Sequence, residues 1–344
     1  MLTVSVVVPV LNAVRTLAAT LGALARLSPP PLELLLVDNG SADGSRELLE
    51  AFAAGRAGGD ARLLEEPRRG ASAARNAGIR AARGEVVAFT DADCLPDAAW
   101  LEHLVVPFAD PTVGAAAGRV MGAPAESILE LFSALYTLRS PETPSRHARW
   151  TPWDGGFPTA NLAVRRRLLD AVGGFDESLP FYGEDYDLCA AVYARGATIA
   201  YTPAARVLHR HRTTLRGLAR QANGFGRAHA LLLRRHAPMG LWLELPRRSV
   251  HWGGMPVRCW IDLAAPEKKL LAILAAGIGY PVLLGLAPVY LAWLAHSARR
   301  RAWNAGAAVS RMESLELASL LLIKSAALTA GRWWGSIRYG ACCL

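Results

Sequence analysis

Short runs of branched hydrophobic residues alternate with amphipathic stretches over the first 120 residues of the chain. The runs at 3–10, 32–37, 62–64 and 86–90 are almost continuously apolar, which is typical of strands buried on both faces. Helices are expected between them, at 14–27, from the turn at 38–44 to about residue 54, at 71–82 and at 98–109. Strands that alternate with helices in this way predict a doubly wound α/β domain.

A less regular part of the chain follows. Residues 141–157 are rich in Pro, Gly and Trp and are expected to form a loop. Beyond this loop, the pattern predicts helices at 162–172 and 185–194, a strand at 198–201 and a basic helix at 215–235. The α/β domain is therefore expected to extend to about residue 212.

The segment 270–295 carries no charged residue, and about 20 apolar residues suffice to cross a bilayer. Pro281 and Pro288 interrupt it, so a kinked span, a re-entrant hairpin and an interfacial helix pair all fit the pattern. A second apolar stretch, 315–330, contains Glu316 and Lys324 and is expected to lie in the membrane interface. The alternative is a pair of buried core helices in a soluble protein. We expect attachment to membrane lipids.

These patterns divide the chain into three parts. The α/β domain occupies 1–212, and a basic helical region that faces the membrane or a substrate occupies 213–266. A hydrophobic, membrane-associated region occupies 267–344.

The composition fits contact with a membrane. Hydrophobic residues make up 52% of the chain and charged residues 19%, and the mean hydropathy is +0.20. The net charge is +9, with arginines gathered at 206–235 and 299–301. Such a surface can face anionic lipid, phosphorylated substrates or nucleic acid, or be a solvated basic face. Because neither zinc-finger spacing nor an aromatic RNA-binding signature accompanies the arginines, we expect no nucleic-acid partner.

Cysteine usage and the amino terminus bear on the compartment. The five cysteines are scattered and lack metal-ligand spacing, which fits a reducing compartment. Met1 leads almost directly into the first strand, so no signal peptide is expected. The expected location is the cytoplasmic face of the cell membrane, with attachment through the C-terminal region.

Acid and amide residues occupy the carboxyl ends of three predicted strands. Asn12 follows the first strand, Asp38 the second, and Asp91 and Asp93 the fourth. Turn formation and helix capping can explain one such residue, but they do not easily explain three strands that end in this way. Ligands of doubly wound sheets bind at the carboxyl ends of the strands, so a ligand site is expected here.

Asp91-Ala92-Asp93 is the candidate metal motif. Two carboxylates that leave a buried strand can hold a divalent cation, and Mg²⁺ and Mn²⁺ prefer such oxygen ligands and bridge readily to a diphosphate. The Asp-x-Asp pattern alone is common by chance, and its place after a strand strengthens it.

Glu184 and Asp185 are a second carboxylate pair, at the start of a predicted helix. A positioned carboxylate there can act as a general base. The structural alternative is that acids favour a helix N-terminus through capping and the helix dipole.

His209 and His211 lie just beyond the predicted strand at 198–201. His209, with His211 as the alternative, can complete a metal shell beside Asp93. A surface histidine among arginines is the other interpretation.

Six segments of the chain form an ordered set of motifs. They are Val8-Pro9-Val10-Leu11-Asn12, the stretch from Val37 to Ser45, the stretch from Gly70 to Gly78, Asp91-Ala92-Asp93, Gly173-Gly174-Phe175-Asp176-Glu177 and Gly183-Glu184-Asp185. In this order they resemble the family 2 glycosyltransferases of the GT-A fold, and the resemblance covers roughly residues 3–235. The resemblance implies a mixed doubly wound sheet flanked by helices and a nucleoside diphosphate sugar as the donor.

The resemblance also implies roles for individual residues. Asp185 would be the general base of an inverting single displacement, supported by Glu184, with Mn²⁺ or Mg²⁺ at Asp93. The donor-binding residues would be Pro9, Asn12, Asp38, Ser41, Arg75 and, on the ribose side, Asp91.

The expected reaction is the transfer of one sugar to a hydroxyl acceptor. Processive synthases of this family carry a Gln-x-x-Arg-Trp motif, from which residues 220–227 depart. A non-processive enzyme is therefore expected, similar to bacterial enzymes that build polysaccharide or glycolipid on lipid carriers. Its acceptor would be a lipid-linked glycan or a polysaccharide precursor.

Three other classes of protein compete with this interpretation. A nicotinamide-dependent oxidoreductase would need Gly-x-Gly-x-x-Gly after the first strand, where Pro9-Val10-Leu11-Asn12-Ala13-Val14 stands. A sugar nucleotidyltransferase would need a Gly-rich phosphate loop near the N-terminus, and none is present in the sequence. A non-catalytic, membrane-bound nucleotide-sugar-binding scaffold remains the alternative, although the joint presence of Asp38, Asp93 and Asp185 argues against it.

Overall fold

The computed structural model describes residues 2–56, 60–137, 140–152, 154–179, 182–210, 214–246 and 248–344. His211, the alternative metal ligand, lies outside these residues. The chain forms two compact units. Unit 1 comprises residues 1–123, 139–180 and 184–210, and unit 2 comprises residues 124–138, 181–183 and 211–344.

Unit 1 is built on one large mixed sheet, with the strand order β3-β2-β1-β4-β8-β6-β9-β5 and β7 paired with β9. Its first four strands run parallel, whereas β8 runs antiparallel to β4 and β6. The strands are β1 (Val4–Val10), β2 (Glu33–Asp38), β3 (Ala61–Glu65), β4 (Val86–Phe89), β5 (Cys94–Pro96), β6 (Val113–Gly122), β7 (Ser145–His147), β8 (Leu162–Arg165) and β9 (Thr198–His209).

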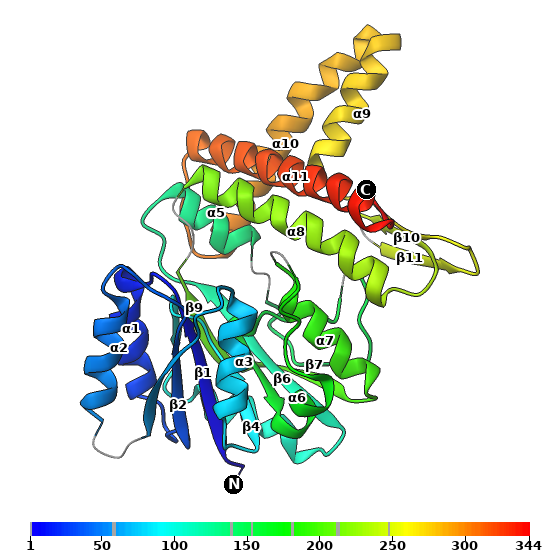
Figure 1. The fold of residues 1–344 in the computed structure, drawn as a ribbon. Coiled ribbons are helices and arrows are strands. Elements are labelled where there is room, and N and C mark those ends of the chain that lie inside the picture. Colours follow the sequence, from blue (N-terminus) through cyan, green and yellow to red (C-terminus); the bar gives the residue numbers. More distant parts are fainter. Residues whose placement is uncertain are drawn as a thin grey trace. The chain divides into compact units, whose positions relative to one another are not determined.

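Helices cover the sheet of unit 1 (Figure 1). Apolar side chains of α3, α6 and α7 pack with Val7, Val87 and Phe89 of the strands, and α4 contacts β6 and β9. The helices of this unit are α1 (Val14–Ala25), α2 (Ser45–Ala54), α3 (Ala71–Ala81), α4 (Trp100–Val105), η1 (Val106–Ala109), η2 (Thr159–Asn161), α6 (Arg166–Val172) and α7 (Glu184–Ala194). The expected doubly wound α/β fold with a mixed sheet is confirmed.

The helix expected at 162–172 is wrong in its first part, because Leu162–Arg165 form strand β8. These residues pair with both β4 and β6 in the middle of the sheet, and their first three side chains are buried. Branched apolar residues suit such a strand, and these long-range pairings outweigh the local helical pattern. The strand expected at 198–201 is also longer, since β9 ends at His209.

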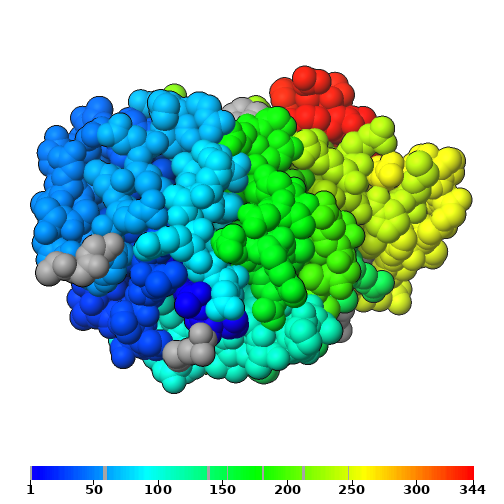
Figure 2. Space-filling model, turned by 60° about the horizontal axis from the view of Figure 1, so that its bottom comes forward, coloured from blue at the N-terminus to red at the C-terminus, as the bar shows by residue number. Residues whose placement is uncertain are grey.

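Segments distant in the sequence share one surface of unit 1. Figure 2 shows residues near 85–115, in cyan, beside residues near 165–200, in green. In the interior of unit 1, Asn161 connects three segments that are distant in the sequence. Its amide donates to the carbonyls of Arg119 (3.0 Å) and Ala205 (2.9 Å), and its oxygen accepts from the indole N–H of Trp100 (2.8 Å).

Unit 2 contains a smaller sheet with the order β11-β10-β12-β13 and a set of long helices. The helices are α5 (Ile128–Tyr136), α8 (Leu215–His236), α9 (Pro266–Gly279), η3 (Pro281–Gly285), α10 (Leu286–Asn304) and α11 (Arg311–Tyr339). The strands are β10 (Gly240–Leu245), β11 (Arg248–Gly253), β12 (Arg258–Asp262) and β13 (Cys342–Cys343). Figure 1 shows α9 and α10 projecting as a hairpin from the pair formed by α8 and α11.

Two segments of the described chain, Pro281–Asn304 and Arg311–Tyr339, are long and apolar enough to cross a membrane, a test that core helices of soluble proteins also pass. Helix α11 is packed within unit 2. A Cβ at Gly331 would overlap the carbonyl of Asn223 on α8, so the two backbones lie very close together. Arg332 is buried on α11 and donates to Asp262 at 2.8 Å. These contacts pack one side of α11 within unit 2, while Trp333 and Ile337 on the helix remain exposed.

Candidate active site

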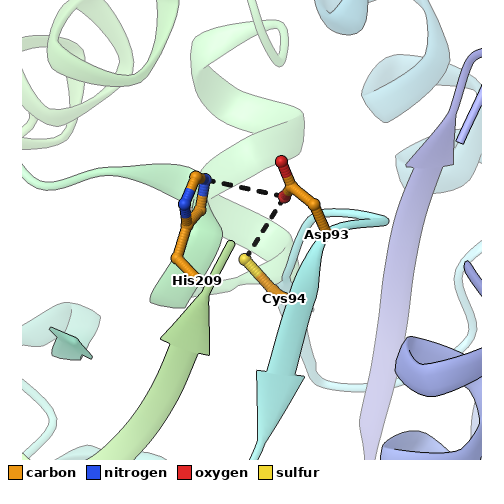
Figure 3. A group of neighbouring side chains, drawn as sticks. All are labelled: Asp93, Cys94 and His209. Atoms are coloured by element: carbon orange, nitrogen blue, oxygen red, sulfur yellow. Dashed lines mark hydrogen bonds and ion pairs between the residues drawn. The ribbon is translucent and has the colours of Figure 1, made fainter. Parts of the chain in front are cut away.

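The loop after β4 carries the two carboxylates of the Asp-x-Asp motif. Asp93 lies beside His209, with 3.5 Å between Oδ1 of the aspartate and Nε2 of the histidine. The buried thiol of Cys94 donates to the same oxygen at 3.7 Å. Figure 3 shows the three side chains converging from β5, its preceding loop and β9. Their ligand atoms all lie within 4.8 Å of one another, as a metal site requires.

Strand pairing creates this cluster. Strand β5 runs antiparallel to β9, and Cys94 is the register partner of His209. The N–H of Arg210 also donates to the carbonyl of Asp93 at 3.0 Å, which holds the loop against the end of β9. In the sequence, Cys94 is one of five scattered cysteines. Only this pairing, between strands far apart in the chain, could have revealed its place.

The chemistry of the cluster fits Mn²⁺. A carboxylate oxygen and an imidazole nitrogen are both good ligands for manganese, whereas magnesium favours oxygen alone. Burial raises the pKa of the Asp93 carboxyl, the charge of His209 opposes that rise, and the charge of Asp91 adds to it. Burial raises the pKa of the Cys94 thiol well above its ordinary value, and the thiol donates to Asp93 in this structure.

Arg75 connects the Asp-x-Asp motif to the second carboxylate pair. Its guanidinium, buried on α3, donates from Nη2 to Asp91 at 2.9 Å and from Nη1 to Glu184 at 3.0 Å. Burial alone would lower the pKa of Arg75, but the carboxylates of Asp91 and Glu184 outweigh it and raise that pKa above its usual range. The arginine therefore carries a fixed positive charge between the two acids.

The segment Gly173-Gly174-Phe175 packs against Arg75. The guanidinium carbon lies 5.6 Å from the centre of the Phe175 ring. The neighbouring Asn76 donates to the carbonyl of Phe175 (2.9 Å) and accepts from its N–H (2.8 Å). Gly174 has φ of +75°, and a Cβ there would meet the side-chain oxygen of Asn76 at 2.5 Å. The glycine thus allows the loop to close on α3.

Asp185 lies in the first turn of α7, beside Glu184. Burial raises the pKa of Asp185 to about 7, helped by the negative charges of Glu184 and Asp91 and opposed by the positive charge of Arg75. A carboxyl group with a pKa near neutrality is suited to general-base work.

Two atoms of this network offer unused hydrogen-bonding capacity. Within the described residues, Arg75 Nε and Glu184 Oε2 are buried and make no hydrogen bond. Buried polar groups are normally satisfied, and exceptions gather where a ligand or water binds.

The remaining predicted donor residues meet in a separate group of loops at the ends of β1 and β2. Asp38 accepts from the N–H of Ser41 at 3.2 Å, and Asn12 accepts from the N–H of Ala42 at 2.9 Å. Asn12 has φ of +51° and donates its N–H to the hydroxyl of Ser41 at 3.1 Å. Pro9 pairs with Val37 within β1 and β2. The structure therefore brings Asn12, Asp38 and Ser41 together at one edge of the sheet.

Two curated proteins show what the chain is similar to. A pre-mycofactocin glycosyltransferase of Mycobacterium tuberculosis is 35% identical over 238 residues, which are 67% of this chain and 48% of that protein. The glycosyltransferase AglE of Haloferax volcanii is 31% identical over 180 residues, which are 51% of this chain and 57% of that protein. The chain thus spans about half the length of the curated relatives it matches.

One solved structure matches nearly the whole chain. The mannosyltransferase PcManGT from Pyrobaculum calidifontis, in complex with GDP-Man and Mn²⁺, matches 97% of this chain and 87% of its own with a TM-score of 0.56 and 24% identity. At that identity the likeness concerns the fold.

A mixed sheet of this order with helices on its faces is the architecture of the GT-A glycosyltransferases. Residues 5–173 match the model of glycosyl transferase family 2. This domain of the chain belongs to that family.

Proposed function

We propose that the protein transfers one sugar from a nucleoside diphosphate donor to a hydroxyl acceptor, with inversion, at the cytoplasmic face of the cell membrane. The observation that carries the proposal is the pair of hydrogen bonds from Arg75 to Asp91 and Glu184. They hold the Asp-x-Asp motif and the carboxylate pair of α7 in one network, so the sugar donor and the base can meet at one acceptor hydroxyl.

In the proposed reaction, Asp185 removes the proton from the acceptor hydroxyl. The acceptor oxygen then forms a bond to the anomeric carbon from the side opposite the diphosphate. The bond between the anomeric carbon and the phosphate oxygen breaks, and its electron pair stays with the nucleoside diphosphate. A positioned base of this kind contributes about 10²–10⁴-fold to a rate.

Asp93 and His209 are the residues that would hold Mn²⁺. When bound there, the metal would neutralise negative charge on the departing diphosphate. Two observations support this. The possible ligand atoms of the cluster lie close together, and the solved complex of PcManGT contains GDP-Man and Mn²⁺. Asp91 and Arg75 would orient the ribose side of the donor.

The nucleoside is proposed to bind at the ends of β1 and β2, against Pro9, Asn12, Asp38 and Ser41. The carboxyl ends of parallel strands are the usual ligand edge of such a sheet. Asp38 is buried, and its Oδ1 accepts the N–H of Ser41. Its second carboxylate oxygen is proposed to accept a hydrogen bond from the nucleoside.

The acceptor is proposed to be a lipid-linked glycan or polysaccharide precursor, used without processive elongation. The exposed apolar surface of unit 2 supports a membrane-bound acceptor, because such surfaces mark contacts with lipid or protein.

A donor panel tests the proposal. Nucleoside diphosphate release is measured with each common nucleotide sugar, with Mn²⁺ or Mg²⁺, in the presence of membrane extract as acceptor source. We expect release with one donor, in Mn²⁺, that the Asp185→Asn variant does not show. The exposed Asp170→Asn on α6 is the matched control. No release with any donor would contradict the proposal.

A further inference from the structure

We infer that the hairpin formed by α9, η3 and α10 enters one leaflet of an anionic bilayer and leaves on the side from which it entered. This inference rests on the membrane attachment proposed above, and not on the sugar transfer.

The hairpin exposes a continuous apolar surface. No charged residue occurs between residues 270 and 295. At the tip, Ile278 is 87% exposed and Val282 is 84% exposed. Large apolar side chains that project in this way mark an interaction site. The other exposed members are Leu271, Leu274, Tyr280, Leu284, Leu286, Val289 and Leu291.

The turn of the hairpin pairs part of its own backbone, and a segment in lipid requires paired backbone groups. The N–H of Tyr280 donates to Ala276 (2.9 Å), and that of Leu283 donates to Tyr280 (2.9 Å). Pro281 has no N–H to satisfy. The end of α9 touches η3, since a Cβ at Gly277 would overlap the side chain of Leu284. The turn is therefore packed against the arm that precedes it.

The length of the arms sets the depth. The apolar part of α9, residues 270–279, rises about 15 Å, and residues 286–293 of α10 rise about 12 Å. The hydrocarbon core of a bilayer is about 30 Å thick, so each arm reaches about halfway.

One face of the lower half of α10 is covered by protein, and its other face carries the exposed Arg299 and Arg300, so this half does not extend the apolar span. Leu294 and Ala295 pack with Ala318 of α11, and Ala298 and Ala302 pack in a core with Phe132 of α5. Although Pro281–Asn304 is long enough to cross a membrane, only its first part combines exposed apolar side chains with a sequence free of charge.

From the tip to the base of the hairpin, the side chains change from apolar to aromatic to basic. This is the order of the hydrocarbon, interface and headgroup layers of a leaflet. The tip is aliphatic apart from Tyr280, and Tyr290 and Trp293 stack further down with ring centres 5.7 Å apart. Arg299 and Arg300 are exposed at the base. Aromatic rings favour the headgroup level, and arginines attract anionic headgroups. The charge at the base and the apolar tip together identify an anionic leaflet as the partner.

Labelling of single positions tests the depth in the full-length protein, reconstituted into vesicles of phosphatidylcholine and phosphatidylglycerol. Gly279→Cys reports on the tip, where a Cβ meets nothing within 4 Å. Ser297→Cys, exposed on α10 below the aromatic pair, is the matched control. A membrane-impermeant maleimide is added outside or trapped inside, and labelling is read peptide by peptide, with the exposed native Cys342 as internal standard.

We expect the tip position to be labelled at least about tenfold less than position 297 from outside, and not at all from inside. Labelling of the tip from inside would mean that the segment spans the bilayer. Labelling from outside as fast as at position 297 would mean that the tip stays in water. Either result overturns the inference.

A second measurement uses flotation with the same vesicles. The double variant Ile278→Asp/Val282→Asp should bind at least about tenfold more weakly, because carboxylates are costly in hydrocarbon. The control is Val106→Asp, at an apolar residue of unit 1 that is 65% exposed. Unchanged flotation of the tip variant, or a wild-type protein that dimerises in solution instead of floating, overturns the inference. Nucleoside diphosphate release in the same samples separates this failure from failure of the transferase proposal.

Discussion

Arg75 donates a 3.0 Å hydrogen bond to Glu184 across 109 positions of the chain. The bond joins α3 to the first turn of α7, and the other terminal nitrogen of the same guanidinium donates to Asp91. One buried cation thus holds the Asp-x-Asp motif and the start of α7 close together.

Replacement of this cation should disrupt both stability and activity. We expect Arg75→Met to lower the free energy of unfolding by about 3–5 kcal/mol, because two partly buried carboxylates lose their partner. The rate of sugar transfer should fall at least about 100-fold, because Asp91 and Glu184 are no longer held in place. Urea unfolding and diphosphate release are the measurements. Arg80→Met, on the exposed side of the same helix, is the control and should change the free energy of unfolding by less than about 1 kcal/mol, because its partner Glu66 keeps two hydrogen bonds from Arg68. A stable Arg75→Met protein with full activity would remove Arg75 from the site.

Asp185→Asn should separate chemistry from binding. We expect transfer to fall about 10²–10⁴-fold, since the amide cannot accept the acceptor proton. Donor affinity, measured by calorimetry with the nucleoside diphosphate, should change less than about threefold, because the substitution keeps the size of the side chain. Equal losses in affinity and in rate would assign Asp185 to donor binding instead.

The pH profile should follow the ionisation of Asp185. Burial raises the pKa of this carboxyl to about 7, and a base acts only when deprotonated, so kcat/KM should rise with pH and level off above about pH 7. The same shift acts on stability with the opposite sign. The native carboxyl keeps its proton where the unfolded one has lost it, so stability falls as pH rises from about 4 to 7. Asp185→Asn should therefore stabilise the protein more at about pH 8 than at about pH 5. A flat rate profile, or a gain in stability independent of pH, would contradict this assignment.

Substitutions in the cluster of Asp93, Cys94 and His209 distinguish residues that bind the metal from residues that only lie next to it. His209→Ala should weaken Mn²⁺ binding at least about tenfold, measured by electron paramagnetic resonance of free Mn²⁺. Cys94→Ser should leave that affinity within about threefold, since a hydroxyl can replace the thiol as a donor to Asp93. If Cys94→Ser loses as much affinity as His209→Ala, the sulfur is itself a ligand.

The contact between α8 and α11 should tolerate no side chain at Gly331. We expect Gly331→Ala to destabilise the protein by about 1–3 kcal/mol, because the new methyl group would overlap the carbonyl of Asn223. Gly285→Ala, where a Cβ meets nothing within 4 Å, is the control. Thermal unfolding of both variants checks this, and equal melting temperatures would refute the close packing.

Local pattern was sufficient for most elements of unit 1. The first four strands and the helices between them are confirmed, because strands buried on both faces must be apolar throughout and the connecting helices must be amphipathic. The same reasoning placed Asp38, Asp91 and Asp93 at the strand ends. Their roles, and those of Asp185 and Arg75, stay predictions, as do the boundaries 1–212, 213–266 and 267–344.

Tertiary structure decided what depends on partners distant in the chain. Leu162–Arg165 became a strand because β4 and β6 pair with it on either side. Cys94 joined Asp93 and His209 only through the register of β5 and β9. In the apolar segment, packing of Leu294 and Ala298 against other helices determined which residues remain exposed. The sequence by itself determined the hydrophobic periods and the acids at the strand ends, since both are local. The tertiary structure determined which strands pair, in which register they pair and which helix faces are buried. Each of these depends on contacts between residues that are distant in the sequence.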